Sequence, residues 1–382
     1  MERRQFLRSA GGVASGLAAV GLAGASGTLA GCVAAPASAD AATCEGEAPP
    51  PADAGAPLLP PATGDVDLPV PRDELVTGAL PGDIQAITEP AFARDWAGLE
   101  DPLSPGEPVI GVERAGQARA YPLATLTGHE AVNDDLGGPL LVTYCPLCAT
   151  AVTAVREVAG EETVFTVSGK LFRSNLVLTD RQTGSLWSQV LARAIRGPAT
   201  GDRLTLVPST LATWGDWRER HPDTEVLLPP PASGTAGHIP GRVRADSGHV
   251  GVGDVGLAFD DDRLPRTAYV VGVAAGDAAR AYPQAQVAGA GVVNDCVGGL
   301  PVVVANRTVP YAYDRRVAGE PRWFERVGSN RLRAAGTIWS ITSGRAVAGR
   351  HAGSRLRRAA GSARMYWFAW LDFHPTTTVY TG

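Results

Sequence analysis

The chain has 382 residues, of which 45% are hydrophobic, and a formal net charge of −5 at pH 7. A chain of this length can bury more than one hydrophobic core. Its mild acidity argues against the basic face that nucleic-acid binding requires, so we expect no nucleic-acid partner. The 46 Gly and 30 Pro residues are typical of a protein with many turns and mostly β structure.

The first 31 residues have the pattern of an export signal. Arg3 and Arg4 precede a Gly- and Ala-rich apolar stretch, as in twin-arginine signals, and Leu29–Cys32 matches a lipobox. We therefore expect an extracytoplasmic protein that is anchored to the cell membrane through lipidated Cys32. An ordinary signal peptide cut at Ala37–Ala39 is the alternative. The following residues, 32–75, are rich in Ala and Pro and predict an extended tether, in which we assign no role to Cys44.

Several motifs in the rest of the chain occur twice. Ala118–Pro122 reappears as Ala279–Pro283, and Val132–Asp134 reappears as Val293–Asp295, both 161 positions later. The recurrence predicts an α+β fold, mostly antiparallel β, made of two tandem copies of one small β-rich unit. The predicted parts are a first unit at 76–230, a connector at 231–264 and a degenerate second copy at 265–382.

Cys145 and Cys148 form a Cys-x-x-Cys motif at the centre of the first unit. The residues before and after the motif follow strand patterns, so we expect both cysteines on a tight turn that Pro146 stiffens. Two thiols at this spacing can form a disulfide, hold a soft metal or present one activated thiolate.

Residues that occur in only one copy are the candidates for chemistry. Asn306 and Val309 align with Cys145 and Cys148, and Ala290 aligns with His129. Lys170 has no lysine opposite it and is the only lysine among the 34 basic residues. By contrast, His221 and His374 recur, and we expect them to be hydrogen-bonding residues at helix ends. The predicted catalytic residues are Cys145, Cys148, His129, Lys170 and Arg181.

These residues predict thiol-based redox chemistry of the kind a thiol oxidoreductase performs. One cysteine would be the nucleophilic thiolate and the other its resolving partner. His129 or Lys170 would lower the thiol pKa, and Arg181 could assist. The substrate would be a redox partner or a small molecule that the sequence does not identify.

Two alternatives stay open. In the first, Cys145, Cys148 and His129 hold Zn or Cu as a cofactor. Cys296 would be a fourth ligand only if the two Asn-Asp turns lay side by side; a buried unpaired thiol is the other interpretation of Cys296. In the second alternative, the protein is a non-enzymatic surface module that binds a partner.

The chain contains five distinctive segments: His129–Asp134, Val142–Cys148, Val167–Leu171, Thr179–Gln189 and His221–Thr224. These segments resemble the motifs of the uncharacterised family called domain of unknown function 3179. The resemblance covers roughly residues 80–230 and, in degenerate form, 265–382, and it implies no particular reaction. The family includes selenoproteins, and a selenocysteine in the Cys-x-x-Cys motif would imply redox chemistry there. Ala149 stands where a glycine often follows the second cysteine, which differs from metal-binding knuckles.

Overall fold

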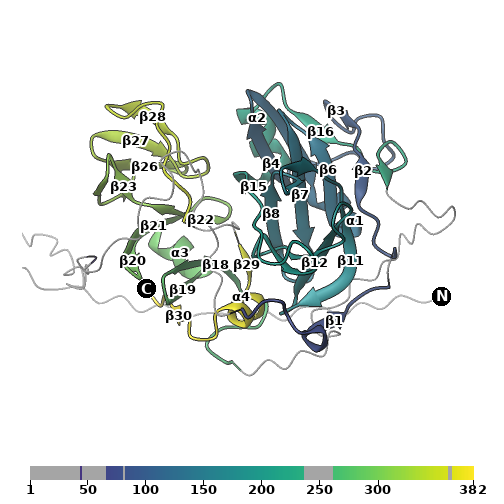
Figure 1. The fold of residues 1–382 in the computed structure, drawn as a ribbon. Helices are drawn as coiled ribbons and strands as arrows, with labels where there is room; N and C mark the ends of the chain where they lie inside the picture. Colours follow the sequence, from purple (N-terminus) through teal and green to yellow (C-terminus); the bar gives the residue numbers. More distant parts are fainter. Residues whose placement is uncertain (1–43, 45–65, 81, 236–260, 360–363) are drawn as a thin grey trace, which may run out of the picture. The chain divides into compact units, whose positions relative to one another are not determined.

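The computed structural model describes Cys44 and residues 66–80, 82–235, 261–359 and 364–382. In these residues strands dominate, and they gather into small sheets (Figure 1). The predicted signal at residues 1–31, the lipidation site Cys32 and most of the predicted tether lie outside the described residues.

Residues 75–235 form three five-stranded sheets. The sheet that carries the two cysteines, which we call the thiol sheet, consists in order of β17 (Gly234–Thr235), β2 (Ile87–Glu89), β6 (Ala131–Asp135), β7 (Pro139–Cys145) and β8 (Thr150–Ala154). The second consists of β1 (Leu75–Thr77), β11 (Phe165–Phe172), β12 (Asn175–Asp180), β13 (Leu186–Ser188) and β14 (Arg193–Arg196). The third consists of β15 (Ser209–Thr213), β4 (Pro108–Arg114), β5 (Gln117–Pro122), β16 (Glu225–Leu227) and β3 (Phe92–Ala93).

Residues 269–379 form three smaller sheets. Their strands are β29 (Met365–Tyr366), β18 (Tyr269–Ala275), β19 (Ala278–Pro283) and β30 (Thr378–Val379) in the first; β20 (Val292–Val297), β21 (Leu300–Asn306) and β22 (Pro310–Asp314) in the second; and β25 (Glu325–Arg326), β26 (Arg331–Ala334), β27 (Thr337–Ser340) and β28 (Ala346–Gly349) in the third. Two further hairpins pair β9 (Glu157–Val158) with β10 (Glu161–Glu162) and β23 (Arg316–Val317) with β24 (Glu320–Pro321).

Helices are short in the described residues, and none of them is long and apolar enough to cross a membrane. A 3₁₀ turn, η1, spans Arg72–Glu74, and the α-helices are α1 (Leu123–His129), α2 (Trp214–Arg220), α3 (Gln284–Ala290) and α4 (Trp367–Phe373). The paired tryptophans of α2 and α4 are buried. His221 and His374 lie at the ends of these helices, as predicted.

The prediction of an α+β fold built from two tandem copies is wrong. The described residues form six sheets of three to five strands with only four seven-residue α-helices, which corresponds to a six-bladed, propeller-like β fold. Only local motifs recur. Arg119 and Tyr121 both contact the Asp134 carboxylate, as Arg280 and Tyr282 contact Asp295. The sheets around these motifs take in strands from distant parts of the chain, such as β2 and β17, so recurring corner motifs do not imply a repeated unit.

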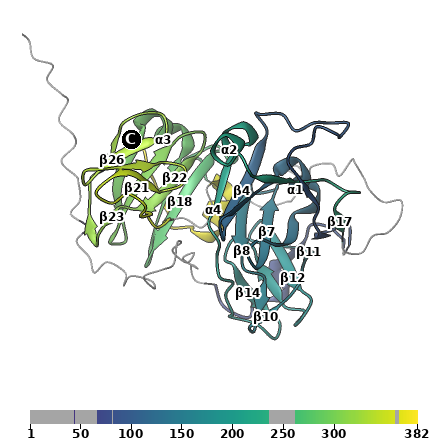
Figure 2. The ribbon, with the colours of Figure 1, turned by 90° about the horizontal axis from the view of Figure 1, so that it is seen from above.

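The core beside the thiol sheet draws on both ends of the described chain. Cys145 and Cys148 are buried with Phe165 and Trp187, and Phe368 of α4 belongs to the same apolar cluster. Figure 2, seen from above, shows α4 near the strands of the thiol sheet. Packing by α4 therefore helps to close off the two sulfur atoms.

Candidate functional site

The two cysteines lie on the turn of the β7–β8 hairpin, as the sequence predicts. Cys145 ends β7 and pairs with Thr150, the first residue of β8. Both thiols are free and fully buried. The turn closes through Ala149, which adopts a left-handed φ of 56° although it has a side chain. The backbone N–H of Tyr366 donates to the Cys148 carbonyl over 3.0 Å, which fixes the turn from outside the hairpin.

A buried polar network holds the sulfur of Cys148. Asn175, the first residue of β12, donates from Nδ2 to Cys148 Sγ at 3.2 Å. Thr150 Oγ1 lies 3.0 Å from the same sulfur. The side chains of Asn175 and Thr150 are both buried, where an unmatched polar group would be costly.

Gln189 completes this network directly after β13. Its Oε1 accepts from Thr150 Oγ1 at 2.7 Å and from Asn175 Nδ2 at 2.8 Å, while its Nε2 donates to Thr143 Oγ1 at 3.1 Å. Because Thr150 gives its single proton to Gln189, the neutral Cys148 thiol can donate to Thr150 Oγ1 and accept from Asn175. After loss of the thiol proton, the sulfur keeps the Asn175 bond, and the Thr150 hydroxyl can turn toward it.

The surroundings of the two thiols shift their pKa values in opposite directions. Burial by itself would raise the pKa of Cys148, but hydrogen bonds from Cys145, Thr150 and Asn175 outweigh burial and lower that pKa below its ordinary value. Burial raises the pKa of Cys145 well above its ordinary value, and the neighbouring Cys148 adds to the rise. Cys148 is therefore the sulfur that ionises first.

Glu130 is an ionisable group beside the thiols that the sequence analysis did not select. It ends α1 in a left-handed conformation with φ 56°, and its carbonyl accepts from the Tyr144 N–H at 2.9 Å. Burial raises the pKa of Glu130 to about 8, and the charge of Cys148 contributes to this rise. Near neutral pH the carboxyl group is therefore mostly protonated, next to a thiol that ionises readily.

His129 lies beside the thiol hairpin, but its imidazole is directed to another partner. Its Nδ1 is 2.7 Å from the carbonyl oxygen of Gln85. Since a carbonyl only accepts, Nδ1 carries the proton, and Nε2 is the acceptor of the neutral ring. His129 is not among the main influences on the pKa of either thiol.

Lys170 and Arg181 are not brought to the thiols. Lys170 lies on β11, and its Nζ donates to Thr77 Oγ1 at 2.7 Å on the exposed side of β1. Arg181 follows β12, and its side chain is exposed. Neither is among the main influences on the pKa of the two thiols. Of the five predicted residues, the structure thus brings together Cys145 and Cys148, places His129 next to them, and leaves Lys170 and Arg181 apart.

The predicted metal ligands do not converge in the described residues. No group of three or more His, Cys, Asp or Glu side chains in that part of the chain is arranged to hold a metal ion. Cys296, the conditional fourth ligand, instead forms a disulfide with Cys44. The interpretation of Cys296 as an unpaired thiol is therefore wrong, and Cys44 gains a structural role.

Part of the site could have been found by extending the comparison of recurring motifs. Pro310 stands at the strand position of Thr150, because Asn306 pairs with Pro310 as Cys145 pairs with Thr150. Ile341 follows the second Trp-Ser pair where Gln189 follows the first, and Gly291 stands in place of Glu130. Thr150, Gln189 and Glu130, like the cysteines, therefore have no polar counterpart at the corresponding positions of the second set of motifs.

Comparison with known proteins identifies a family and no reaction. The family model described as "Protein of unknown function (DUF3179)" matches residues 81–377. No curated protein and no solved structure matches the chain.

Proposed function

Because the chain belongs to the DUF3179 family of proteins of unknown function, whose description assigns no reaction, we propose a function from the thiol site itself. Cys145 and Cys148 form a dithiol that exchanges with a disulfide of a partner molecule. The observation that carries the proposal is the contact of Asn175 Nδ2 and Thr150 Oγ1 with Cys148 Sγ, at 3.2 and 3.0 Å. A purely structural cysteine would need no polar network, since a buried thiol packs as a small hydrophobic group.

Cys148 is the nucleophile in this proposal, because its thiolate is the better stabilised of the two. It attacks one sulfur of the partner disulfide, so that a mixed disulfide forms and the other partner sulfur leaves as a thiolate. Cys145 then attacks Cys148, which forms the Cys145–Cys148 disulfide and releases the second partner sulfur. Two electrons pass to the partner disulfide, which is reduced to a dithiol. One of its two new protons comes from Cys145 by way of Glu130, and the other is the proton that Cys148 released to solvent when its thiolate formed.

Glu130 serves the proton transfers of these two steps. In its protonated form it gives a proton to the first leaving thiolate, and as a carboxylate it then accepts the proton of Cys145. The high pKa of Cys145 requires such a base before this thiol can act as the resolving group. With a pKa of about 8, Glu130 can do both near neutral pH.

We also propose that the protein is exported and anchored to the membrane through lipidated Cys32. The support is the Arg3-Arg4 signal and the lipobox, together with the Cys44–Cys296 disulfide, since disulfides persist mainly outside the cytoplasm. Mass spectrometry of the membrane fraction should find a diacylglycerol-modified Cys32. A Cys32→Ala variant that stays in the membrane fraction would contradict the anchor.

The reduction potential of the Cys145–Cys148 pair tests the redox function. We expect a potential between roughly −270 and −120 mV, the range of thiol–disulfide exchange proteins. The measurement equilibrates the full chain in glutathione or dithiothreitol buffers and counts alkylated Cys145 and Cys148 by mass spectrometry.

An Asn175→Ala variant provides the matched comparison, because it removes the donor to Cys148 and keeps both sulfurs. Loss of this donor destabilises the reduced, thiolate-bearing form and should make the pair less oxidising. A pair with a potential below about −300 mV, as in structural disulfides, would refute the proposal.

A further inference from the structure

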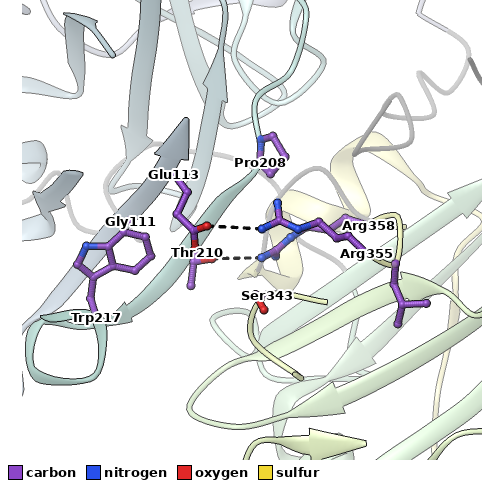
Figure 3. A pocket seen from close by; sticks show the side chains of 9 residues that line it. Gly111, Glu113, Pro208, Thr210, Trp217, Ser343, Arg355 and Arg358 are labelled. Carbon is purple, nitrogen blue, oxygen red and sulfur yellow. Dashed lines mark hydrogen bonds and ion pairs between the residues drawn. The ribbon is translucent and has the colours of Figure 1, made fainter. Parts of the chain in front are cut away.

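A second polar site lies away from the thiols, where the β4–β15 edge meets the turn after β27 and residues 355–358 (Figure 3). It is a small cavity of about 20 Å³ that is partly open to solvent, so a ligand would enter it only with one small polar group. Glu113 and Thr210 line one side, and Ser343, Arg355 and Arg358 line the other. Figure 3 shows the two guanidinium groups directed toward Glu113 and Thr210.

The cationic groups at this site outnumber the acidic ones. Glu113 accepts from His221 Nε2 at 3.2 Å and faces Arg345 and Arg355 at 3.4 and 3.7 Å. The hydrogen bond from His221 and the charges of His221, Arg355 and Arg345 hold the pKa of Glu113 at about 2. A single carboxylate, that of Glu113, is thus the shared partner of two arginines and a histidine.

The arginines also repel one another. Arg345 and Arg355 face each other across an antiparallel β-bridge, where like charges are unfavourable. Burial, Arg345 and Arg358 lower the pKa of Arg355, and Glu113 opposes this only in part. The distances from Glu113 to Arg345 and Arg355 exceed those of a well-formed charged hydrogen bond, so Glu113 does not saturate their donors.

Arg358 extends the donor set of the cavity, and Arg220 lies nearby, in the pocket that it lines together with His221. Arg358 is buried and donates from Nη2 to Thr210 Oγ1 at 3.3 Å and to the Thr342 carbonyl at 3.0 Å. Arg220 is close enough to Glu113 for that charge to affect its pKa, and its buried Nη2 has no hydrogen-bond partner in the described residues. A bound anion could accept the hydrogen bond that this buried donor does not make, and it would also balance the excess positive charge.

We propose that this cavity binds a small oxyanion, the phosphate or carboxylate group of a small molecule. Arg345 and Arg355 supply the charge, Arg358 and the hydroxyls of Thr210 and Ser343 supply fixed donors, and Glu113 partly occupies the place of the anion. Guanidinium groups suit such a ligand because their planar arrangement of N–H donors matches two oxygens at once. The site is separate from the thiol hairpin and independent of the redox proposal.

The test is a titration of the full chain with inorganic phosphate and, in a second arm, with acetate, followed by calorimetry at constant ionic strength. We expect saturable binding of at least one of the two anions, and the arm that binds identifies the class. In Glu113→Gln the competing carboxylate is removed, so the Kd should fall roughly tenfold. Adding Arg355→Gln to that variant should raise the Kd again by a similar factor.

Two controls separate binding from general charge effects and from misfolding. Arg331→Gln removes an exposed arginine of β26, away from the cavity, and should leave the Kd unchanged. Arg355→Lys keeps the positive charge but loses the planar set of guanidinium N–H donors. It should therefore weaken binding less than Arg355→Gln does. Absence of saturable binding to the wild type and Glu113→Gln, or a Kd that is equal in all variants, would overturn the proposal.

Discussion

At the scale of single residues, Glu130 is the group whose ionisation should be visible in the stability of the protein. Its pKa is about 8 in the folded chain and about 4.5 as an isolated group. Between these values the folded protein keeps the Glu130 proton, while the unfolded chain has lost it. The free energy of unfolding therefore falls as pH rises from about 4.5 to about 8, and the loss levels off above pH 8.

Glu130→Gln should abolish this dependence, because the amide stays neutral at every pH. We expect the variant to gain stability over the wild type with rising pH, reaching on the order of 4 kcal/mol near pH 8. Urea unfolding at pH 5, 6, 7 and 8 measures the difference. Glu219→Gln, at an exposed position of α2, is the control and should show no such trend. A constant difference between Glu130→Gln and wild type across this range would contradict a half-buried Glu130 that keeps its proton up to about pH 8.

The sequence could predict some residues of the site but not the directions of their side chains. The spacing of Cys145 and Cys148 was sufficient to select them. His129 and Glu130 are adjacent, and the left-handed turn that ends α1 decides which of the two faces the thiols. Asn175 and Gln189 were not selected, because a polar residue in or after a strand gives no sign of the sulfur it contacts across the sheet.

At the scale of elements, α4 is the segment that links the thiol core to the end of the chain. Phe368 and Ala369 pack in the apolar cluster that contains both cysteines. Phe373 meets Phe172 edge-on with ring centroids 5.9 Å apart, and the Ser174 hydroxyl donates to the Asp372 carboxylate. These contacts hold α4 against the core that contains both sulfurs.

Phe368→Ala should therefore expose the thiols as well as destabilise the fold. Removing this buried ring costs roughly 3–5 kcal/mol, and the space it leaves lies next to the cysteines. We expect Cys148 in the native protein to react faster with iodoacetamide, as measured by mass spectrometry. Phe324→Ala is the matched control, since Phe324 is equally buried in a different cluster. Equal alkylation rates in the two variants would show that α4 does not cover the site.

Local elements were more predictable than their partners. The alternating residues around the cysteines correctly predicted β7, β8 and the turn between them, because these strands are neighbours in the chain. β2 and β17 are also strands of the thiol sheet, but they pair with residues far apart from them in the sequence. Such short strands do not specify in the sequence which strand they will pair with.

At the scale of the whole molecule, recurring motifs led to the wrong architecture. The Arg–Tyr–Asp corners at Asp134 and Asp295 are repeated because the same local hydrogen bonds stabilise both hairpins. Six small sheets, long-range strand pairs and the Cys44–Cys296 disulfide depend on contacts that such motifs do not encode. The sequence nevertheless shows that both sulfurs, and the polar residues Thr150, Gln189 and Glu130, are missing from the second set of motifs.

The most direct test of the thiol site is a titration of thiolate absorbance at 240 nm in the reduced protein, with Cys145→Ser and Cys148→Ser variants to assign each step. We predict that the first thiolate forms at Cys148 below the ordinary thiol pKa of about 8.5, and that Cys145 ionises well above this value. Asn175→Ala should raise the first midpoint. Ionisation of Cys145 before Cys148, or of both at or above about 8.5, would contradict the account.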